Sequence, residues 1–312
     1  MPSHPAPPSV LPGVAKSLLT ATVSLGLLAC SLSPLARRTS SFANAATITA
    51  TSTGDAYQLV EQTFRDAQIA RLVANYDTSG FDAAKLHPFL PDADLQVRSK
   101  LLKGLRSYAE LLATISGDQP LADVDAGAKS LGDSLRSLST NDLVAAHFTP
   151  QNANLGATAI TALGRVLVES KRRRELPSIL HDMREPIETI CDLLAQDIGD
   201  PARSGLRNEL HISYLDLLRE QKNYIADNTS KLLPSERRDE IRLLPRLAGY
   251  ESGADRALAG TQRALAQLAL THTTLAATAS QKSSPAFDLQ MQQLAATALQ
   301  LQSSFASLPS HP

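Results

Sequence analysis

The residues best suited to chemistry lie in the middle of the chain, where carboxylates surround two histidines. This candidate set comprises His181, Glu185, Glu188, Asp192, Glu209 and His211. Folding can gather such side chains from separate helices into an acid–base site without leaving a local sequence motif. An enzyme with a site around His181 and His211 is therefore one of two functional hypotheses.

His181 and Glu185 are the histidine–carboxylate pair whose spacing would suit two ligands of one metal ion. Residues four apart lie on the same face of a helix. Zinc requires a third and a fourth ligand, however, and the E-x-x-H and H-E-x-x-H spacings of helical metal sites are absent. The pair is a weak metal candidate, and the sequence predicts neither a metal nor a cofactor.

No motif or composition signal identifies a reaction. The sequence has no G-x-S-x-G, P-loop or dinucleotide-binding pattern. Because Trp is absent and aromatic residues make up only 4% of the chain, few side chains could stack on sugars. With 30 basic and 31 acidic residues there is no positive excess for a nucleic-acid backbone. We therefore predict no catalytic residue and favour a binding or scaffold module, for a protein partner or an apolar ligand.

The elements that must position these residues are helices. Leu101, Leu105, Tyr108, Leu112 and Ile115 alternate in steps of four and three, which is typical of helices that pack almost parallel to a neighbour. Similar stripes recur along the chain and no segment alternates with a period of two. We predict an all-α, antiparallel bundle of about eight amphipathic helices with coiled-coil-like packing. The predicted helices cover residues 55–74, 94–115, 121–138, 155–175, 177–194, 200–225, 235–279 and 287–308.

Several details of this bundle follow from single positions. The apolar phase passes through Pro186 without a slip, so we expect a kinked but continuous helix there. The helix from residue 200 is apolar on two sides and should be central. The run 171–174 (Lys-Arg-Arg-Arg) should be a solvated helix C-terminus, with contact to anionic lipid as the alternative. His272 and Cys191 fall on apolar faces and are expected in the core.

The N-terminal stretch concerns location. Lys16 is followed by an apolar run from Leu18 to Leu28, and the sequence Leu27-Leu28-Ala29-Cys30 ends it. This arrangement resembles the signal peptide and lipobox of bacterial lipoproteins. The run is too short to span a bilayer, which takes about 20 apolar residues. The resemblance implies that residues 1–29 are removed and that Cys30 carries lipid.

The lipoprotein resemblance also sets the expected organisation and location. Residues 30–54 would be the lipidated cysteine and a flexible tether, 55–308 a single helical domain and 309–312 a tail. Since Ser31 is not the Asp that retains lipoproteins at the inner membrane, the resemblance implies an outer-membrane protein facing the periplasm if the source is Gram-negative. The alternative is cleavage after Ala45, which would leave a secreted or soluble periplasmic protein.

Overall fold

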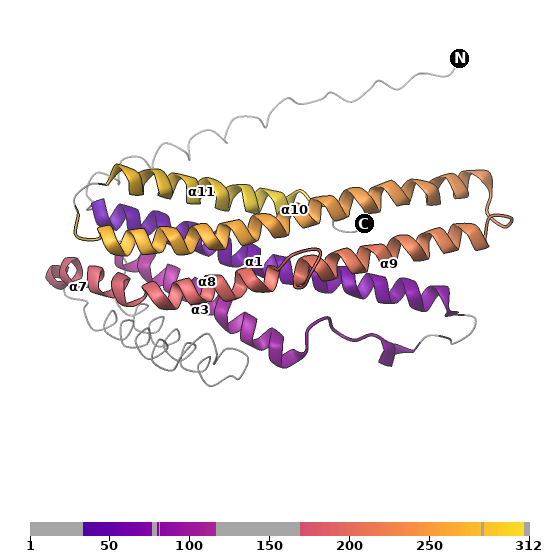
Figure 1. Ribbon diagram of the computed structural model, residues 1–312, viewed down its shortest axis with the longest axis horizontal. Coiled ribbons are helices and arrows are strands. Elements are labelled where there is room, and N and C mark those ends of the chain that lie inside the picture. Colours follow the sequence, from indigo (N-terminus) through magenta and orange to yellow (C-terminus); the bar gives the residue numbers. More distant parts are fainter. Residues whose placement is uncertain (1–33, 77–79, 81, 117–168, 282–283, 309–312) are drawn as a thin grey trace, which may run out of the picture. The chain divides into compact units, whose positions relative to one another are not determined.

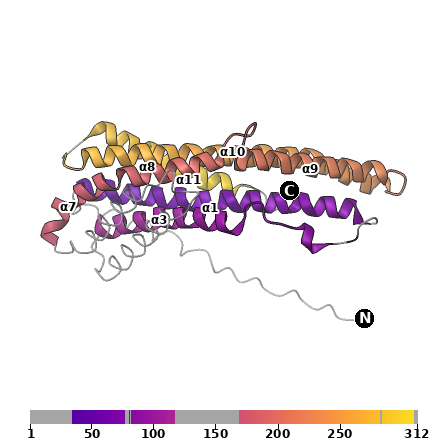
Figure 2. The same cartoon turned by 60° about the horizontal axis from the view of Figure 1, so that its bottom comes forward.

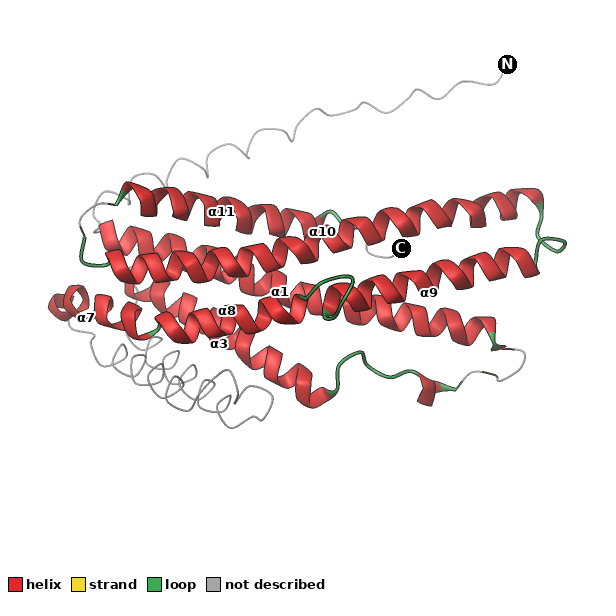
Figure 3. Cartoon of the chain, in the orientation of Figure 1, coloured by secondary structure: helices red, strands yellow, loops and turns green. Residues whose placement is uncertain are grey.

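The computed structural model describes residues 34–76, 80, 82–116, 169–281 and 284–308. Within these ranges the chain forms seven α-helices and one 3-10 helix, and no β-strand (Figure 3). The only extended pairing among them is a single bridge between Asp200 and Ser204. The predicted all-α class is confirmed. Two of the predicted helices, over 121–138 and most of 155–175, lie outside the described residues.

The helices differ greatly in length. The described elements are α1 (Pro34–Ala74), η2 (Ala83–Lys85), α3 (Asp92–Ser116), α7 (Glu169–Asp182), α8 (Arg184–Ile198), α9 (Leu206–Asp227), α10 (Pro234–Thr278) and α11 (Pro285–Ala306). At 1.5 Å per residue the 45 residues of α10 extend for about 67 Å. This length lets α8 and α9 pack end to end along α10, while α11 lies beside its C-terminal half (Figure 1).

Helices α1 and α10 form the centre of the bundle: α1 packs against α3, α9, α10 and α11, and α10 packs against α1, α7, α8, α9 and α11 (Figures 1 and 2). Small side chains allow several helices to approach one another closely. Two of the buried threonines on α1, Thr53 and Thr63, donate their hydroxyls to carbonyls four residues earlier, which satisfies them inside the bundle. The buried stripe of α1 alternates in steps of four and three and consists mainly of small residues: Phe42, Ala46, Thr49, Thr53, Ala56, Val60, Thr63 and Ala67.

Two predictions are corrected by α1. The expected flexible tether over 30–54 is wrong for residues 34–54, which form the first half of a helix and bury Phe42 and Ala46 completely. The helix from residue 200 is not the central one. In α9, Leu206, Leu210 and Tyr214 are buried, whereas Leu215 on the second apolar stripe is 49% exposed.

The start of α9 also differs from the prediction, since residues 200–205 form a tight turn and the helix begins at Leu206. Gly199 and Gly205 adopt positive φ angles of 70° and 90°. A Cβ at Gly199 would lie 2.0 Å from the carbonyl oxygen of Ser204, so this turn requires glycine. The turn redirects the chain between α8 and α9.

The segment around Pro177 and Pro186 is one helical path with a break of a single residue. α7 ends at Asp182 and α8 begins at Arg184, but the Met183 N–H still bonds to Ile179 O and the Ile187 N–H to Met183 O. The predicted continuity without a loop holds, and the interruption falls at Met183 because Pro186 has no N–H to bond back to Asp182. Pro177 lies inside α7 and not in a first turn.

The prediction that the basic run 171–174 ends a helix is also wrong, because these residues belong to the first turns of α7.

The long helices match the predicted stripes. Leu101, Leu105, Tyr108, Leu112 and Ile115 of α3 are buried, as are the in-phase leucines of α10 and Phe287, Met291, Leu294, Ala298 and Leu301 of α11. A polar cluster links α1, α3 and α8. Asp197 of α8 accepts one hydrogen bond from Arg98 Nη2 of α3, at 3.0 Å, and one from the Tyr57 hydroxyl of α1, at 2.8 Å. The Arg98 Nε also lies 2.6 Å from Asp197 Oδ2, as an ion pair.

Candidate functional site

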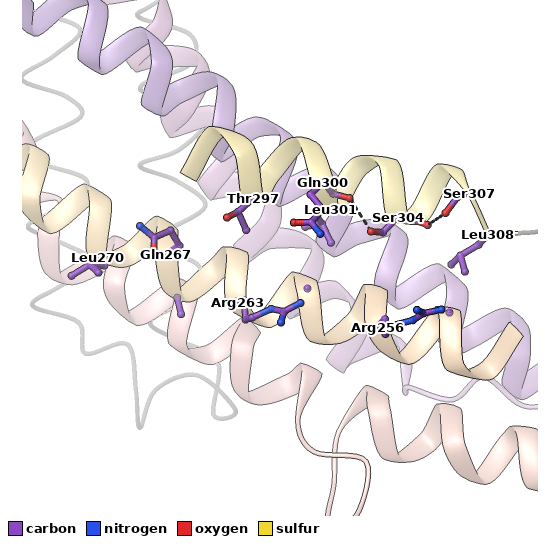
Figure 4. Close-up of a pocket in the computed structure, with 13 residues that line it drawn as sticks. Arg256, Arg263, Gln267, Leu270, Thr297, Gln300, Leu301, Ser304, Ser307 and Leu308 are labelled. Carbon is purple, nitrogen blue, oxygen red and sulfur yellow. Dashed lines mark hydrogen bonds between the residues drawn. The ribbon is translucent and has the colours of Figure 1, made fainter. Parts of the chain in front are cut away.

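A groove with a volume of about 970 Å³ lies between α10 and α11 (Figure 4). We call it the α10–α11 groove. Helix α10 lines it with Gly253, Arg256, Gly260, Arg263, Ala266, Gln267 and Leu270, and α11 with Thr297, Gln300, Leu301, Ser304, Ser307 and Leu308. The positions on both helices recur mostly in steps of three and four, so each helix presents one continuous face to the groove.

Two glycines bring α11 close to α10. A Cβ at Gly253 would lie 3.2 Å from Leu308 Cδ2, and one at Gly260 would lie 3.5 Å from Leu301 Cδ1. The leucines of α11 therefore rest directly on the glycine positions of α10. A Cβ at Gly253 would require a small shift of the Leu308 side chain, whereas one at Gly260 would make an ordinary van der Waals contact with Leu301.

The charge of the groove comes from Arg256 and Arg263, whose side chains are exposed and extend along α10 in Figure 4. None of the described residues that line the groove is Asp or Glu. The Arg256 Nε donates to Ser252 O at 3.1 Å, and among the described salt bridges none involves Arg256 or Arg263. The groove is a positively charged surface without an internal counter-charge.

Two of the three hydroxyls on the α11 side, those of Ser304 and Ser307, are already engaged as donors. Ser304 Oγ donates to Gln300 O at 2.8 Å and Ser307 Oγ to Ser304 O at 2.9 Å, as the dashed lines in Figure 4 show. Their oxygens remain available as acceptors. The two arginines are therefore the charged donors that the groove offers to a ligand.

A second pocket of about 340 Å³ lies between α9 and α10 and contains His211. Its ionisable side chains contact one another. Arg207 binds Asp255 through two contacts of 2.7 and 2.9 Å, and His211 Nδ1 lies 2.6 Å from Glu251 Oε1. The hydrogen bond with Asp255 raises the pKa of Arg207. These pairs tie α9 to α10.

The six chemistry-bearing residues predicted from the sequence do not meet in either pocket. Of the set, only His211 lines the second pocket. His181, Glu185, Glu188 and Asp192 are exposed on α7 and α8. Glu209 lies on α9 and accepts a hydrogen bond of 3.3 Å from Ser213 Oγ.

The metal candidates His181 and Glu185 are both exposed. Within the described ranges, no three or more His, Cys, Asp or Glu side chains are grouped so that they could hold a metal ion. Any coordination by these two residues would have to be completed by groups elsewhere.

The predicted core residues His272 and Cys191 are buried as expected. The Tyr108 hydroxyl lies 2.7 Å from His272 Nε2, whereas His272 Nδ1 has no hydrogen-bond partner. Burial lowers the pKa of His272 to about 3 and raises that of the Cys191 thiol, so both groups are neutral and unreactive near pH 7.

The lipidation candidate, Cys30, lies outside the described residues, and its assignment stays a prediction. None of the helices in the described part of the chain is long and apolar enough to cross a bilayer.

The α10–α11 groove was not predicted from the sequence. The pattern that could have indicated it is a second stripe on α10, beside the apolar stripe that packs into the core; it is formed by Gly253, Arg256, Gly260, Arg263 and Leu270. Because four of these five residues are glycines or arginines, apolar periodicity does not detect the stripe. Comparison with known proteins adds no assignment: no family model matches the chain, and neither a curated protein nor a solved structure matches it significantly.

Proposed function

We propose that the protein is a lipid-anchored cell-envelope binding module that holds a helix of a protein partner in the α10–α11 groove. The observation that supports this role is the pairing of two helical faces, each with three–four periodicity, along a groove of about 970 Å³. A third helix that packs alongside two such faces completes a coiled-coil-like arrangement. The groove runs from Gly253 to Leu270, about 26 Å at the helical rise, which suits four to five helical turns of a partner.

A protein partner fits this groove better than an apolar ligand does. Sites for small apolar ligands are enclosed and mainly hydrophobic. The α10–α11 groove is open along its length, and its lining includes two arginines, two glutamines and three hydroxyl-bearing residues. An elongated partner could use both the leucines and the polar edge.

The lipid anchor at Cys30 is the second part of the proposal. Because α1 begins at Pro34, only Ser31, Leu32 and Ser33 would lie between the anchor and the bundle. Three intervening residues and their links reach about 14 Å at most, from roughly 3.3 to 3.6 Å per residue. The bundle would therefore work close to the membrane, in the outer membrane facing the periplasm if the source is Gram-negative, and not at the end of a long tether.

The finer architecture belongs to the same proposal. We propose that the complete bundle holds about eight helices packed antiparallel in a coiled-coil-like manner. The matched stripes of α3, α10 and α11 support this arrangement.

Site-specific photo-crosslinking in an expressing bacterium tests the binding role. A crosslinker at Thr297, inside the groove, should capture a helical segment of a protein partner. The same crosslinker at Gln292, which is exposed on α11 but does not line the groove, is the matched control. Equal capture at both positions, or none at Thr297, would contradict the proposal.

The anchor is tested separately by the mass of the mature N-terminus. We expect an acylated chain that starts at Cys30 and fractionates with membranes, and loss of both properties in Cys30→Ala. A chain that starts at Ala46 without acyl mass would refute the anchor.

A further inference from the structure

We infer that the helix bound in the α10–α11 groove is amphipathic and carries two carboxylates seven residues apart, which pair with Arg256 and Arg263. This inference rests on the binding role proposed above and specifies the chemistry of the partner. Three features of the groove support it: the spacing of its cations, the absence of a counter-charge and the apolar contacts beside them.

The spacing of the arginines matches a helical ligand. Arg256 and Arg263 are separated by seven residues, or about two turns, so their Cα atoms lie roughly 10.5 Å apart on one face of α10. A single phosphate or carboxylate is only a few ångströms wide and could contact one guanidinium at a time. Two carboxylates at positions i and i+7 of a second helix have the same separation as the arginines. One extended partner can therefore satisfy both cations.

Arg256 and Arg263 have no carboxylate partner among the described residues that line the groove. The thirteen lining residues include no Asp or Glu, and the nearest internal contact of Arg256 is a backbone carbonyl. By contrast, Arg207 at the α9–α10 pocket is fully paired with Asp255. Arginine forms planar, bidentate contacts with carboxylates that a lysine cannot reproduce. The unpaired arginines thus favour a carboxylate-bearing ligand.

Apolar contacts favour an amphipathic partner. Leu270 is 51% exposed at one end of the groove, and Leu308 is half-buried at the other. Between them, the Leu308 and Leu301 side chains of α11 cover Gly253 and Gly260 of α10 and add apolar surface to the groove. Leucine or alanine side chains of a partner helix could pack against these leucines while its acidic edge faces the arginines. Helices that bind in grooves commonly combine apolar anchors with a charged rim in this way.

A second copy of the chain is a less suitable occupant. The exposed face of α8 does carry Glu185 and Asp192 seven residues apart, but it presents no large exposed apolar side chain to pack against the leucines of the groove. Helix α9 has exposed apolar side chains, but its carboxylates at Asp216 and Glu220 are already paired with arginines of the same chain. Self-association is therefore an outcome that the experiment must detect, and it would overturn the inference of a separate partner.

Binding of designed peptides tests the inference with the full chain in mild detergent. The probe is a fluorescein-labelled amphipathic helix of about 18 residues, with leucines in three–four spacing and two glutamates seven apart beside them. A matched peptide has glutamine in place of both glutamates. Fluorescence anisotropy at low and at about 0.3 M NaCl measures affinity and its screening.

We expect the acidic peptide to bind the wild-type protein and the glutamine peptide to bind about tenfold more weakly. Arg256→Gln combined with Arg263→Gln should remove this preference and the salt dependence. Arg238→Gln combined with Arg246→Gln is the control, because both residues are exposed on α10 outside the groove. Unchanged thermal unfolding of the variants shows that folding is not the cause.

Three results would overturn the inference. The first is equal binding of both peptides, or no binding of the acidic peptide at about 1 mM. The second is an equal loss in the control variant. The third is concentration-dependent self-association in sedimentation equilibrium that Glu185→Gln with Asp192→Gln abolishes. Capture of a partner helix at Thr297 together with either of the first two results would leave the proposed binding role intact and remove only its acidic chemistry.

Discussion

The buried pair of Tyr108 and His272 should make the protein lose stability in mild acid. Burial lowers the pKa of His272 from 6.5 to about 3, and the unfolded chain has the ordinary value. The unfolded state therefore binds a proton below pH 6.5 that the folded state cannot accept. This contribution to stability is essentially complete at pH 7.5 and is lost as the pH falls through 6.5. Between pH 7.5 and pH 4.5 the loss is roughly 2.7 kcal/mol, because the slope approaches about 1.36 kcal/mol per pH unit below pH 6.5.

The structure explains why the histidine stays neutral. His272 is completely buried, its Nε2 is 2.7 Å from the Tyr108 hydroxyl, and its ring centroid lies 5.3 Å from that of Phe42. Desolvation alone accounts for the lowered pKa, so no nearby carboxylate would stabilise a charged ring. A proton added to His272 would place an uncompensated charge in the core.

The test is a comparison of wild type with Tyr108→Phe combined with His272→Leu. Changing both residues avoids an orphaned hydroxyl, so the variant should fold at pH 7.5. Urea unfolding followed by circular dichroism gives the free energy of unfolding from pH 7.5 to 4.5. We expect the wild-type value to fall relative to the variant by about 2.7 kcal/mol between pH 7.5 and 4.5. His181→Gln, at an exposed position, should follow the wild type. Parallel curves for wild type and the double variant would refute the reasoning.

Other predictions concern packing and ion pairs, with the free energy of urea unfolding as the measurement. Leu105→Ala and Leu301→Ala should each lower the free energy of unfolding by about 2 to 5 kcal/mol, because both side chains are buried. Leu215→Ala, at an exposed site, should lower it by less than about 0.5 kcal/mol. Equal effects would mean that the stripes are misassigned. Asp197→Asn should cost about 1 to 3 kcal/mol by weakening contacts with two helices, and a neutral result would show that the contacts are not formed. Arg207→Lys loses the bidentate contact with Asp255 and should cost about 0.5 to 1 kcal/mol; no change would indicate an open α9–α10 pair.

The sequence predicted the helices whose buried faces are made of leucine. The prediction of 235–279 differs from α10 by one residue at each end, and the stripes of α3 and α11 are buried as expected. The start of α1 was missed because its core positions are Ala46, Thr49, Thr53 and Ala56. A Ser/Thr/Ala-rich composition is shared by flexible tethers and by helices at the centre of a bundle. The steps of four and three were present, but no large apolar residue marked them.

The α10–α11 groove was harder to predict for a related physical reason. Core stripes are recognised because burial demands apolar side chains, while an exposed groove can keep polar and small residues on its surface. Gly253, Arg256, Gly260 and Arg263 have helical spacing but no common chemistry. These residues line a groove only because α11 packs beside them, and a local sequence pattern does not reveal that packing. The same limit applies to α8, where the acidic residues predicted for a site are spread over an exposed face.

The start of α1 also bears on where the mature chain can begin. Cleavage after Ala45 would remove Phe42, Ala43 and Ala45, which are buried, together with the contact of 3.2 Å between Arg38 and Asp288. Loss of a buried phenylalanine side chain alone typically costs about 3 to 5 kcal/mol. Such a loss is a large part of the roughly 5 to 15 kcal/mol that stabilises most proteins.

We therefore predict that a chain starting at Ser31 is as stable as the mature protein, whereas one starting at Ala46 unfolds at markedly lower urea concentration. Phe42→Ala in the longer chain is the companion variant and should reproduce most of the loss, because it removes the largest fully buried side chain of the deleted segment. If residues 34–45 were a tether, both changes would alter the free energy of unfolding by less than about 0.5 kcal/mol. A loss of stability in both variants would show that the bundle needs residues 34–45. The mature chain must then begin before Pro34, and a chain processed at Cys30 does so.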